Sequence, residues 1–213
     1  PSAPYFETFI ERRFSWGAWM GGNLGPILKP WIGIVHVPLE IPHWFGQSNV
    51  CTEIAKTPAW QLSAPYCRGL FTLSRSLLES LRTVPELAAL PMDVLLHPTE
   101  FGASTWSPER YLHNPRRAIV QIGSTYRNLH GIHCVPSGPY QKWLAMGGSA
   151  ASFQSLYAQE EAALLAAGRY TPGLDAGTVY LDFLDDAAYD AVFTENIIFA
   201  EYYAASATNS VLE

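Results

Sequence analysis

A histidine lies near the end of the most apolar run in the first half of the chain. The run covers residues 31–37, with the sequence WIGIVHV, and His36 is its only strongly polar side chain. Ligands of open α/β sheets bind at the carboxyl ends of the strands, so an imidazole at this point is well placed to face a cleft and to take part in catalysis. A structural histidine, bonded to a neighbouring loop, is the alternative, and the sequence leaves both interpretations open.

A glycine turn follows a second apolar run. Gly123 and Ser124 come directly after the run AIVQI (118–122), and Arg127 is expected at the start of the next helix. The N–H groups at a helix N-terminus favour a phosphate. A guanidinium adds a charge-assisted hydrogen bond. This pattern predicts a phosphate site after the strand 118–122.

The last residues repeat this arrangement. They follow the run NIIFA (196–200), and an expected helix begins near Asn209 and Ser210, with Thr208 or Asn209 as its cap. Glu213 then lies in the first turn, where a carboxylate can accept hydrogen bonds from a ribose diol. The chain stops inside this helix, which suggests a shortened C-terminal unit.

Other polar clusters have simpler interpretations. The segment HGIHC (130–134) offers zinc-type ligands at close spacing, but it has no clear further ligand pair. Asp182, Asp185 and Asp186 could bind a cation, although a helix cap with solvated acids explains them better. The glycine-rich run 21–25 lacks the lysine of a phosphate-binding loop and predicts a plain turn.

The elements expected to position these residues alternate between strands and helices, which predicts α/β architecture with parallel sheets. Helices are expected over 74–82, 151–167 and 186–193, the second ended by Gly168 and the third capped by Asp185. A polar, turn-rich stretch at 97–117 predicts the linker between an N-terminal domain (1–115) and a C-terminal domain (116–213). The expected strands are 31–37, 69–73, 93–96, 118–122, 178–181 and 196–200, with 5–10 as a weaker candidate.

Charge and composition exclude several classes of protein. Thirteen basic and nineteen acidic residues give a net charge of −6, and no stretch concentrates lysine and arginine, so nucleic-acid binding is not expected. No apolar run is long enough for a membrane span, and the first residues do not form a signal peptide. Three cysteines without CxxC spacing are typical of reduced thiols, so we expect a cytoplasmic protein.

Four stretches together resemble a glycosyltransferase of the GT-B fold, in which two Rossmann-like domains face each other across a cleft. They are 30–45 (PWIGIVHVPLEIPHWF), 69–82 (GLFTLSRSLLESLR), 94–100 (VLLHPTE) and 196–213 (NIIFAEYYAASATNSVLE). The segment GLFTLS is similar to the family's strand that ends in serine before a helix. The segment NSVLE is similar to the helix that ends in Leu-Glu and holds the nucleotide ribose. The family's helix continues where this chain stops.

The resemblance implies an enzyme that transfers a sugar from a nucleotide-sugar to an unknown acceptor. The donor would be bound without a metal, because no DxD motif is present and DFLDD (182–186) has a different spacing. A non-catalytic sugar- or nucleotide-binding or scaffold protein of the same fold is the alternative, and a homodimer could cover the shortened C-terminal unit. The residues that the resemblance assigns are Gly123 and Arg127 at the diphosphate, Asn209 and Ser210 at the donor phosphates, Glu213 at the ribose, and His36 near the transferred sugar.

Overall fold

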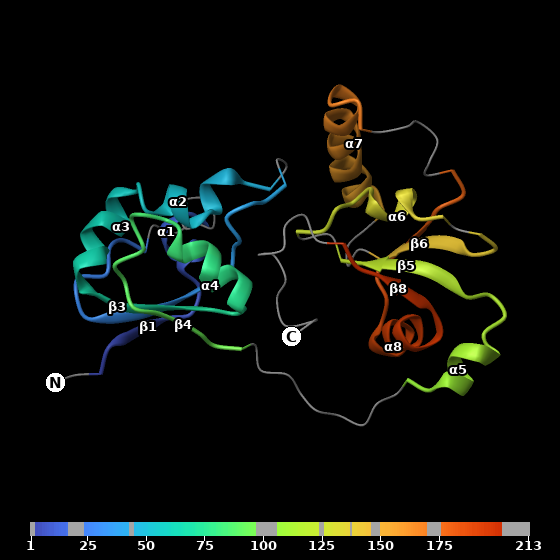
Figure 1. The fold of residues 1–213 in the computed structure, drawn as a ribbon, viewed down its shortest axis with the longest axis horizontal. Helices are drawn as coiled ribbons and strands as arrows, with labels where there is room; N and C mark the ends of the chain where they lie inside the picture. Colours follow the sequence, from blue (N-terminus) through green and yellow to red (C-terminus); the bar gives the residue numbers. More distant parts are fainter. Residues whose placement is uncertain are drawn as a thin grey trace. The chain divides into compact units, whose positions relative to one another are not determined.

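The computed structural model describes residues 3–16, 24–42, 45–96, 106–123, 126–136, 138–145, 150–169 and 176–201. These residues form two compact units, the first inside Pro1–Glu100 and the second inside Phe101–Tyr202. Each unit contains a four-stranded sheet in which all neighbouring strands are parallel (Figure 1). The predicted fold class, α/β with two Rossmann-like parallel-sheet units, is therefore confirmed.

In the first unit the order of the strands in the sheet, β1-β2-β3-β4, is the same as their order along the chain. The helices α1 to α4 lie on one side of this sheet (Figure 1). The elements are β1 (Tyr5–Glu7), α1 (Ile10–Phe14), β2 (Trp31–Val35), the 3-10 helix Gln47–Asn49, α2 (Cys51–Ile54), α3 (Pro58–Ser63), the 3-10 helix Ala64–Tyr66, β3 (Cys67–Thr72), α4 (Arg75–Arg82) and β4 (Met92–Val94).

An aromatic cluster joins the helices of the first unit to its sheet. The ring of Trp31 on β2 packs edge-on against Trp60 of α3, with centroids 5.7 Å apart, and also contacts Phe14 of α1. The indole N–H of Trp31 donates to the carbonyl of Ser63 at 2.9 Å, so this buried polar group is satisfied. Gly33 on the same strand face is tightly enclosed, because a Cβ there would lie 2.6 Å from a methyl of Ile10.

In the second unit the strand order is β7-β6-β5-β8. The helices α6 and α7 lie on one side of the sheet and α8 lies on the other (Figure 1). The elements are α5 (Pro108–His113), β5 (Ala118–Ile122), α6 (Gly131–Cys134), β6 (Gln141–Ala145), α7 (Ala150–Ala166), β7 (Val179–Leu181), α8 (Asp186–Glu195) and β8 (Ile197–Phe199).

Most expected elements are present, and several others were not predicted, among them the short helices α1, α2 and α3. Strand β5 has the predicted bounds, α8 is capped by Asp185, whose carboxylate accepts the N–H of Ala188 at 2.8 Å, and Gly168 after α7 has a φ of +66°. Strand β6 was not predicted, and the stretch expected to be a pure linker contains helix α5. The helix expected near Asn209 lies outside the described residues.

Among the helices of the described residues, none is both long enough and apolar enough to span a membrane.

Candidate functional site

His36 follows β2 directly at the carboxyl end of the first sheet. Its imidazole stacks on the ring of Phe9, with ring centroids 3.9 Å apart and an interplanar angle of 4°. Its Nδ1 lies 3.8 Å from Oε2 of Glu11, and the side chain is 22% exposed. The ring is therefore stacked on one face, its Nδ1 faces the carboxylate without a hydrogen bond, and part of the side chain remains open to solvent.

Glu11 is a fully buried carboxylate in the first turn of α1. Its Oε1 accepts two backbone hydrogen bonds, from the N–H groups of His36 and Val37, each at 2.8 Å. Because α1 follows β1 after a short turn, its first residues lie beside the carboxyl end of the neighbouring strand β2. The other oxygen, Oε2, is directed toward the imidazole, so one side chain both ties down the loop after β2 and faces the histidine.

This arrangement can support proton transfer. An imidazole with one edge against a buried carboxylate can accept a proton at its other nitrogen, because the carboxylate stabilises the resulting imidazolium. Cys51, on the neighbouring helix α2, has no comparable reactivity. Burial, and secondly the negative charge of Glu11, raise the pKa of the Cys51 thiol well above its ordinary value, so the thiolate is scarce at neutral pH.

The second unit has a point where the strand order reverses. From β5 the chain moves outward through β6 to β7 and then returns to the other side of β5 with β8. Helix α6, which leads into β6, and helix α8, which leads into β8, lie on opposite faces of the sheet, because the chain crosses to the two sides of β5 in opposite directions (Figure 1). In open parallel sheets, ligands bind at the carboxyl ends of the strands beside such a reversal.

Gly123 lies at this reversal, at the carboxyl end of β5. Its N–H donates to the carbonyl of Ala145 at 2.9 Å, and its φ is +78°, a conformation that favours glycine. Among the described residues, its chain neighbours aside, no heavy atom lies within 4 Å of the place that a Cβ would occupy. The backbone is therefore open to close approach by a ligand.

The expectation that Arg127 starts a helix is wrong. The backbone turns at Tyr126, whose φ is +58°, and the N–H of Asn128 donates to the carbonyl of Glu201 at 3.0 Å rather than within a helix. Helix α6 begins only at Gly131 and has four residues. Arg127 thus belongs to a loop fastened to the exit of β8, in the same β5–α6 connection as Gly123.

Glu201 is a second acidic residue that the sequence analysis missed. It follows β8, and its carboxylate lies so close to Gly131 that a Cβ at that glycine would overlap it. The signal that could have identified Glu201 is the one that drew attention to His36, a polar side chain directly after an apolar strand. Asn209, Ser210 and Glu213 lie outside the described residues, so their assignment to the donor stays a prediction.

The histidines of the segment 130–134 are part of a buried cluster. His130 and His133 are each 3% exposed and pack against the ring of Tyr157 on α7. His133 Nδ1 lies 3.3 Å from the hydroxyl of Thr178, whereas Cys134 is exposed. Within the described ranges, no three His, Cys, Asp or Glu side chains gather so that they could hold a metal ion. Packing explains these histidines.

A comparison with protein-family models, with curated proteins and with solved structures found no match to this chain. The class of protein that the fold defines is an α/β protein with two Rossmann-like parallel-sheet units. The strand-end sites, which are His36 with Glu11 after β2 and Gly123 with Arg127 after β5, are the features that bear on its function.

Proposed function

We propose that this chain is a metal-independent glycosyltransferase that uses a nucleotide-sugar donor. The observation that carries the proposal is the reversal of strand order between β5 and β8, with Gly123 at the carboxyl end of β5. The order β7-β6-β5-β8 matches strands 3-2-1-4 of the Rossmann fold, in which nucleotides bind where the strand order reverses between the first and fourth strands.

The second unit supplies the donor site in this proposal. Gly123 lets the diphosphate approach the backbone, and Arg127 in the same loop compensates its charge as the nucleoside diphosphate leaves. Asn209 and Ser210 contact the donor phosphates, and Glu213 binds the ribose. Glu201 is added to this set because it lies at the same strand ends.

The first unit supplies the base. His36 removes the proton from the acceptor hydroxyl as that oxygen attacks the anomeric carbon of the donor, and the bond from that carbon to the diphosphate breaks. Glu11 stabilises the imidazolium formed, through the 3.8 Å approach of its Oε2 to Nδ1. The partial exposure of His36 supports this role, because a base has to reach its substrate.

The donor site is tested by calorimetry and thermal shift against UDP, GDP, ADP and CDP, since a ligand that binds the native state raises its melting temperature. We expect one of the four to bind, and Arg127→Ala to weaken that binding about tenfold or more. Arg116→Ala is the matched control, because Arg116 is an exposed arginine of the same unit. Equal affinities of the two variants would remove Arg127 from the donor site.

The catalytic role is tested by release of the nucleoside diphosphate in the presence of a panel of acceptors. His36→Ala is expected to reduce turnover by about 10²–10⁴-fold, the usual contribution of a general base, and to leave nucleotide affinity unchanged. Nucleotide binding without turnover in the unmodified protein would instead support the alternative, a non-catalytic nucleotide- or sugar-binding protein. The hydrogen bonds of Glu11 to the loop favour that alternative, because they suit a structural role.

A further inference from the structure

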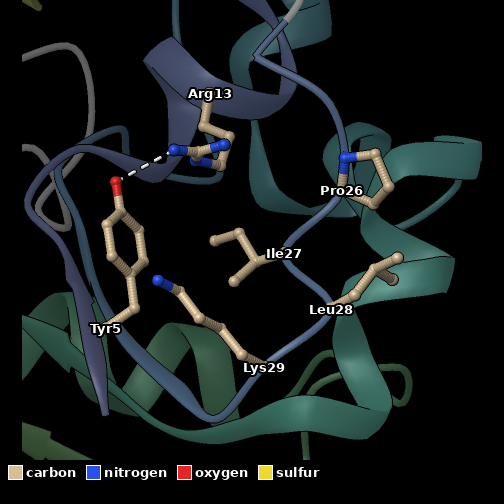
Figure 2. A pocket seen from close by; sticks show the side chains of 6 residues that line it. All are labelled: Tyr5, Arg13, Pro26, Ile27, Leu28 and Lys29. Atoms are coloured by element: carbon tan, nitrogen blue, oxygen red, sulfur yellow. Dashed lines mark hydrogen bonds between the residues drawn. The ribbon is translucent and has the colours of Figure 1, made fainter. Parts of the chain in front are cut away.

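A cavity of the first unit lies at the amino ends of the strands, whereas His36 lies at their carboxyl ends. The cavity has a volume of about 330 Å³ and lies at the amino ends of β1 and β2, between α1 and the segment 24–29 that leads into β2 (Figure 2). This volume is at the lower end of the range for small-molecule sites, roughly 300–1,000 Å³. The side chains around it are Tyr5, Arg13, Pro26, Ile27, Leu28 and Lys29.

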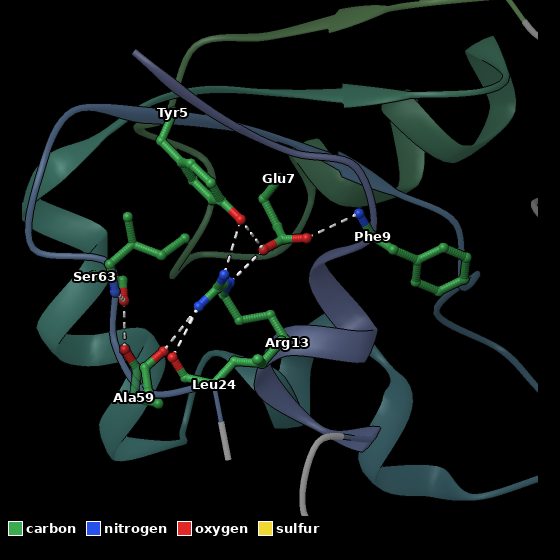
Figure 3. Close-up of polar contacts among 9 residues, drawn as sticks. Tyr5, Glu7, Phe9, Arg13, Leu24, Ala59 and Ser63 are labelled. Atoms are coloured by element: carbon green, nitrogen blue, oxygen red, sulfur yellow. Dashed lines mark hydrogen bonds and ion pairs between the residues drawn. The ribbon is translucent and has the colours of Figure 1, made fainter. Parts of the chain in front are cut away.

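The wall of the cavity is held in place from two sides. The N–H of Ile27 donates to the hydroxyl of Ser63 at 2.8 Å, and that hydroxyl donates to the carbonyl of Ala59 on α3 at 2.7 Å (Figure 3). Arg13 donates to the carbonyls of Leu24 and Gly25 at 3.0 and 3.3 Å. The segment is thus fastened to two helices, and the cavity exists without a ligand.

Arg13 is already neutralised. Its Nε forms an ion pair with Glu7, and its Nη2 donates to the hydroxyl of Tyr5 at 2.9 Å (Figure 3). Burial alone lowers the pKa of Arg13, but its hydrogen bonds to Glu7 and Tyr5 outweigh this effect and raise it, so the guanidinium stays charged. The Arg13–Glu7 pair therefore adds a fixed dipole to the wall but no net charge.

Lys29 brings the remaining charge. Its ammonium lies over the ring of Tyr5, 5.0 Å from the centroid, and projects toward the middle of the hollow (Figure 2). Its residue is exposed, and within the described part of the chain no carboxylate pairs with it. The cavity thus carries one net positive charge on a preformed wall.

The other side chains that line the cavity are apolar, and two of them are exposed to solvent. Leu28 is 61% exposed and Pro26 is also exposed, although both border the cavity. A ligand that covered them would remove apolar surface from water, which is favourable. The complementary molecule has one negative charge and a short hydrocarbon part.

We propose that this cavity binds a small organic carboxylate. The carboxylate pairs with the ammonium of Lys29, and the hydrocarbon part lies against Pro26 and Leu28. A dianionic phosphate is disfavoured, because one lysine leaves half of its charge uncompensated and the carboxylate of Glu7 repels it from behind Arg13. This site is separate from the strand-end sites, so it stands or falls independently of the glycosyltransferase proposal.

The test is a titration of the ¹⁵N-labelled full chain, followed by the backbone amide resonances. The probes are isovalerate, its neutral counterpart isovaleramide, and inorganic phosphate at the same ionic strength. We expect isovalerate to shift the amides of Tyr5 and 27–29 with saturation in the millimolar range, and the other two to bind at least about threefold more weakly. Shifts that do not saturate, or equal binding of the amide or of phosphate, would overturn the proposal.

Two substitutions locate the contacts. Lys29→Gln is expected to weaken isovalerate binding about three- to tenfold, and Leu28→Ser by about threefold, whereas Lys56→Gln leaves it unchanged. Lys56 is the matched control because it is an exposed lysine of the same unit that pairs with Glu53. All three residues are exposed, so we expect the substitutions to leave the fold intact. Unchanged affinity of Lys29→Gln would refute the assignment even if isovalerate binds.

Discussion

Replacement of Glu11 tests how the loop that carries His36 is held. In Glu11→Ala the N–H groups of His36 and Val37 lose their acceptor. Each buried donor left unsatisfied costs about 1–3 kcal/mol, so together we expect a loss of about 3–5 kcal/mol. Glu11→Gln keeps one carbonyl oxygen in the place of Oε1, and we expect it to cost about 1 kcal/mol.

Hydrogen exchange followed by mass spectrometry is the suitable assay, because it reports the two units separately. A peptide over β2 is expected to lose protection by a factor of about 10²–10⁴ in Glu11→Ala and by about tenfold or less in Glu11→Gln. A peptide over β5 serves as the internal control. Glu53→Ala is the matched control variant, because the Glu53 side chain is 45% exposed and pairs with Lys56 on the surface.

The reasoning is refuted if Glu11→Ala reduces the protection of β2 no more than Glu11→Gln does. That result would mean that the two backbone hydrogen bonds contribute little, and that Glu11 matters only through its charge beside His36. The same pair of variants also separates the roles of Glu11 in turnover. Glu11→Gln removes the negative charge but preserves the loop, so we expect it to reduce the release of nucleoside diphosphate without lowering nucleotide affinity.

Three further results are expected. Gly33→Ala introduces a Cβ against the fully buried side chains of Ile10 and Trp31. A urea titration is expected to show that overpacking lowers the free energy of unfolding by about 1–3 kcal/mol, and an unchanged midpoint would contradict this packing. Asp185→Ala removes the cap of α8 and is expected to lower the free energy of unfolding by about 1 kcal/mol. Asp185→Asn keeps an acceptor and is expected to lower it less, so equal melting temperatures of the two variants would count against the cap. Iodoacetamide at pH 8 is expected to label Cys134, the exposed cysteine, first. Burial raises the pKa of Cys67 to about 11 and the pKa of Cys51 well above its ordinary value, so both stay protonated as thiols. Rapid labelling of all three cysteines in the native protein would contradict this. For Cys67 the raised pKa also means that its contribution to stability is complete below about pH 9 and is lost as the pH rises toward 11.

Strands were predictable where apolar and β-branched residues follow one another. The run 118–122 is AIVQI, and β5 has the same bounds because it is an interior strand of its sheet and is buried on both faces. Strand β6 was missed because it begins with Gln141 and Lys142, which have no such pattern. It forms a strand because β5 and β7 offer hydrogen-bonding partners on both sides, and this long-range pairing is not visible in a local window.

The candidate site was only partly predictable for the same reason. His36 could be found because a polar residue at the end of an apolar run is conspicuous. Glu11 could not, because in the run IERRF an acidic residue next to two arginines is typical of a solvated helix face. Its burial depends on the position of the first turn of α1 beside the loop after β2, which is a tertiary contact.

The strand orders of the two sheets have different consequences during synthesis on the ribosome. In the first unit every strand pairs with the strand made just before it, so the sheet can grow as the chain emerges and is complete once β4 has appeared. In the second unit Ile197 of β8 pairs with Ile119 of β5, 78 residues earlier in the chain. One edge of β5 therefore stays unpaired through most of the translation of this unit, and an open strand edge invites association with other chains. The pairing of β8 with β5 is thus the last strand pairing among the described residues of this unit, and anything that binds only the paired sheet would favour that step.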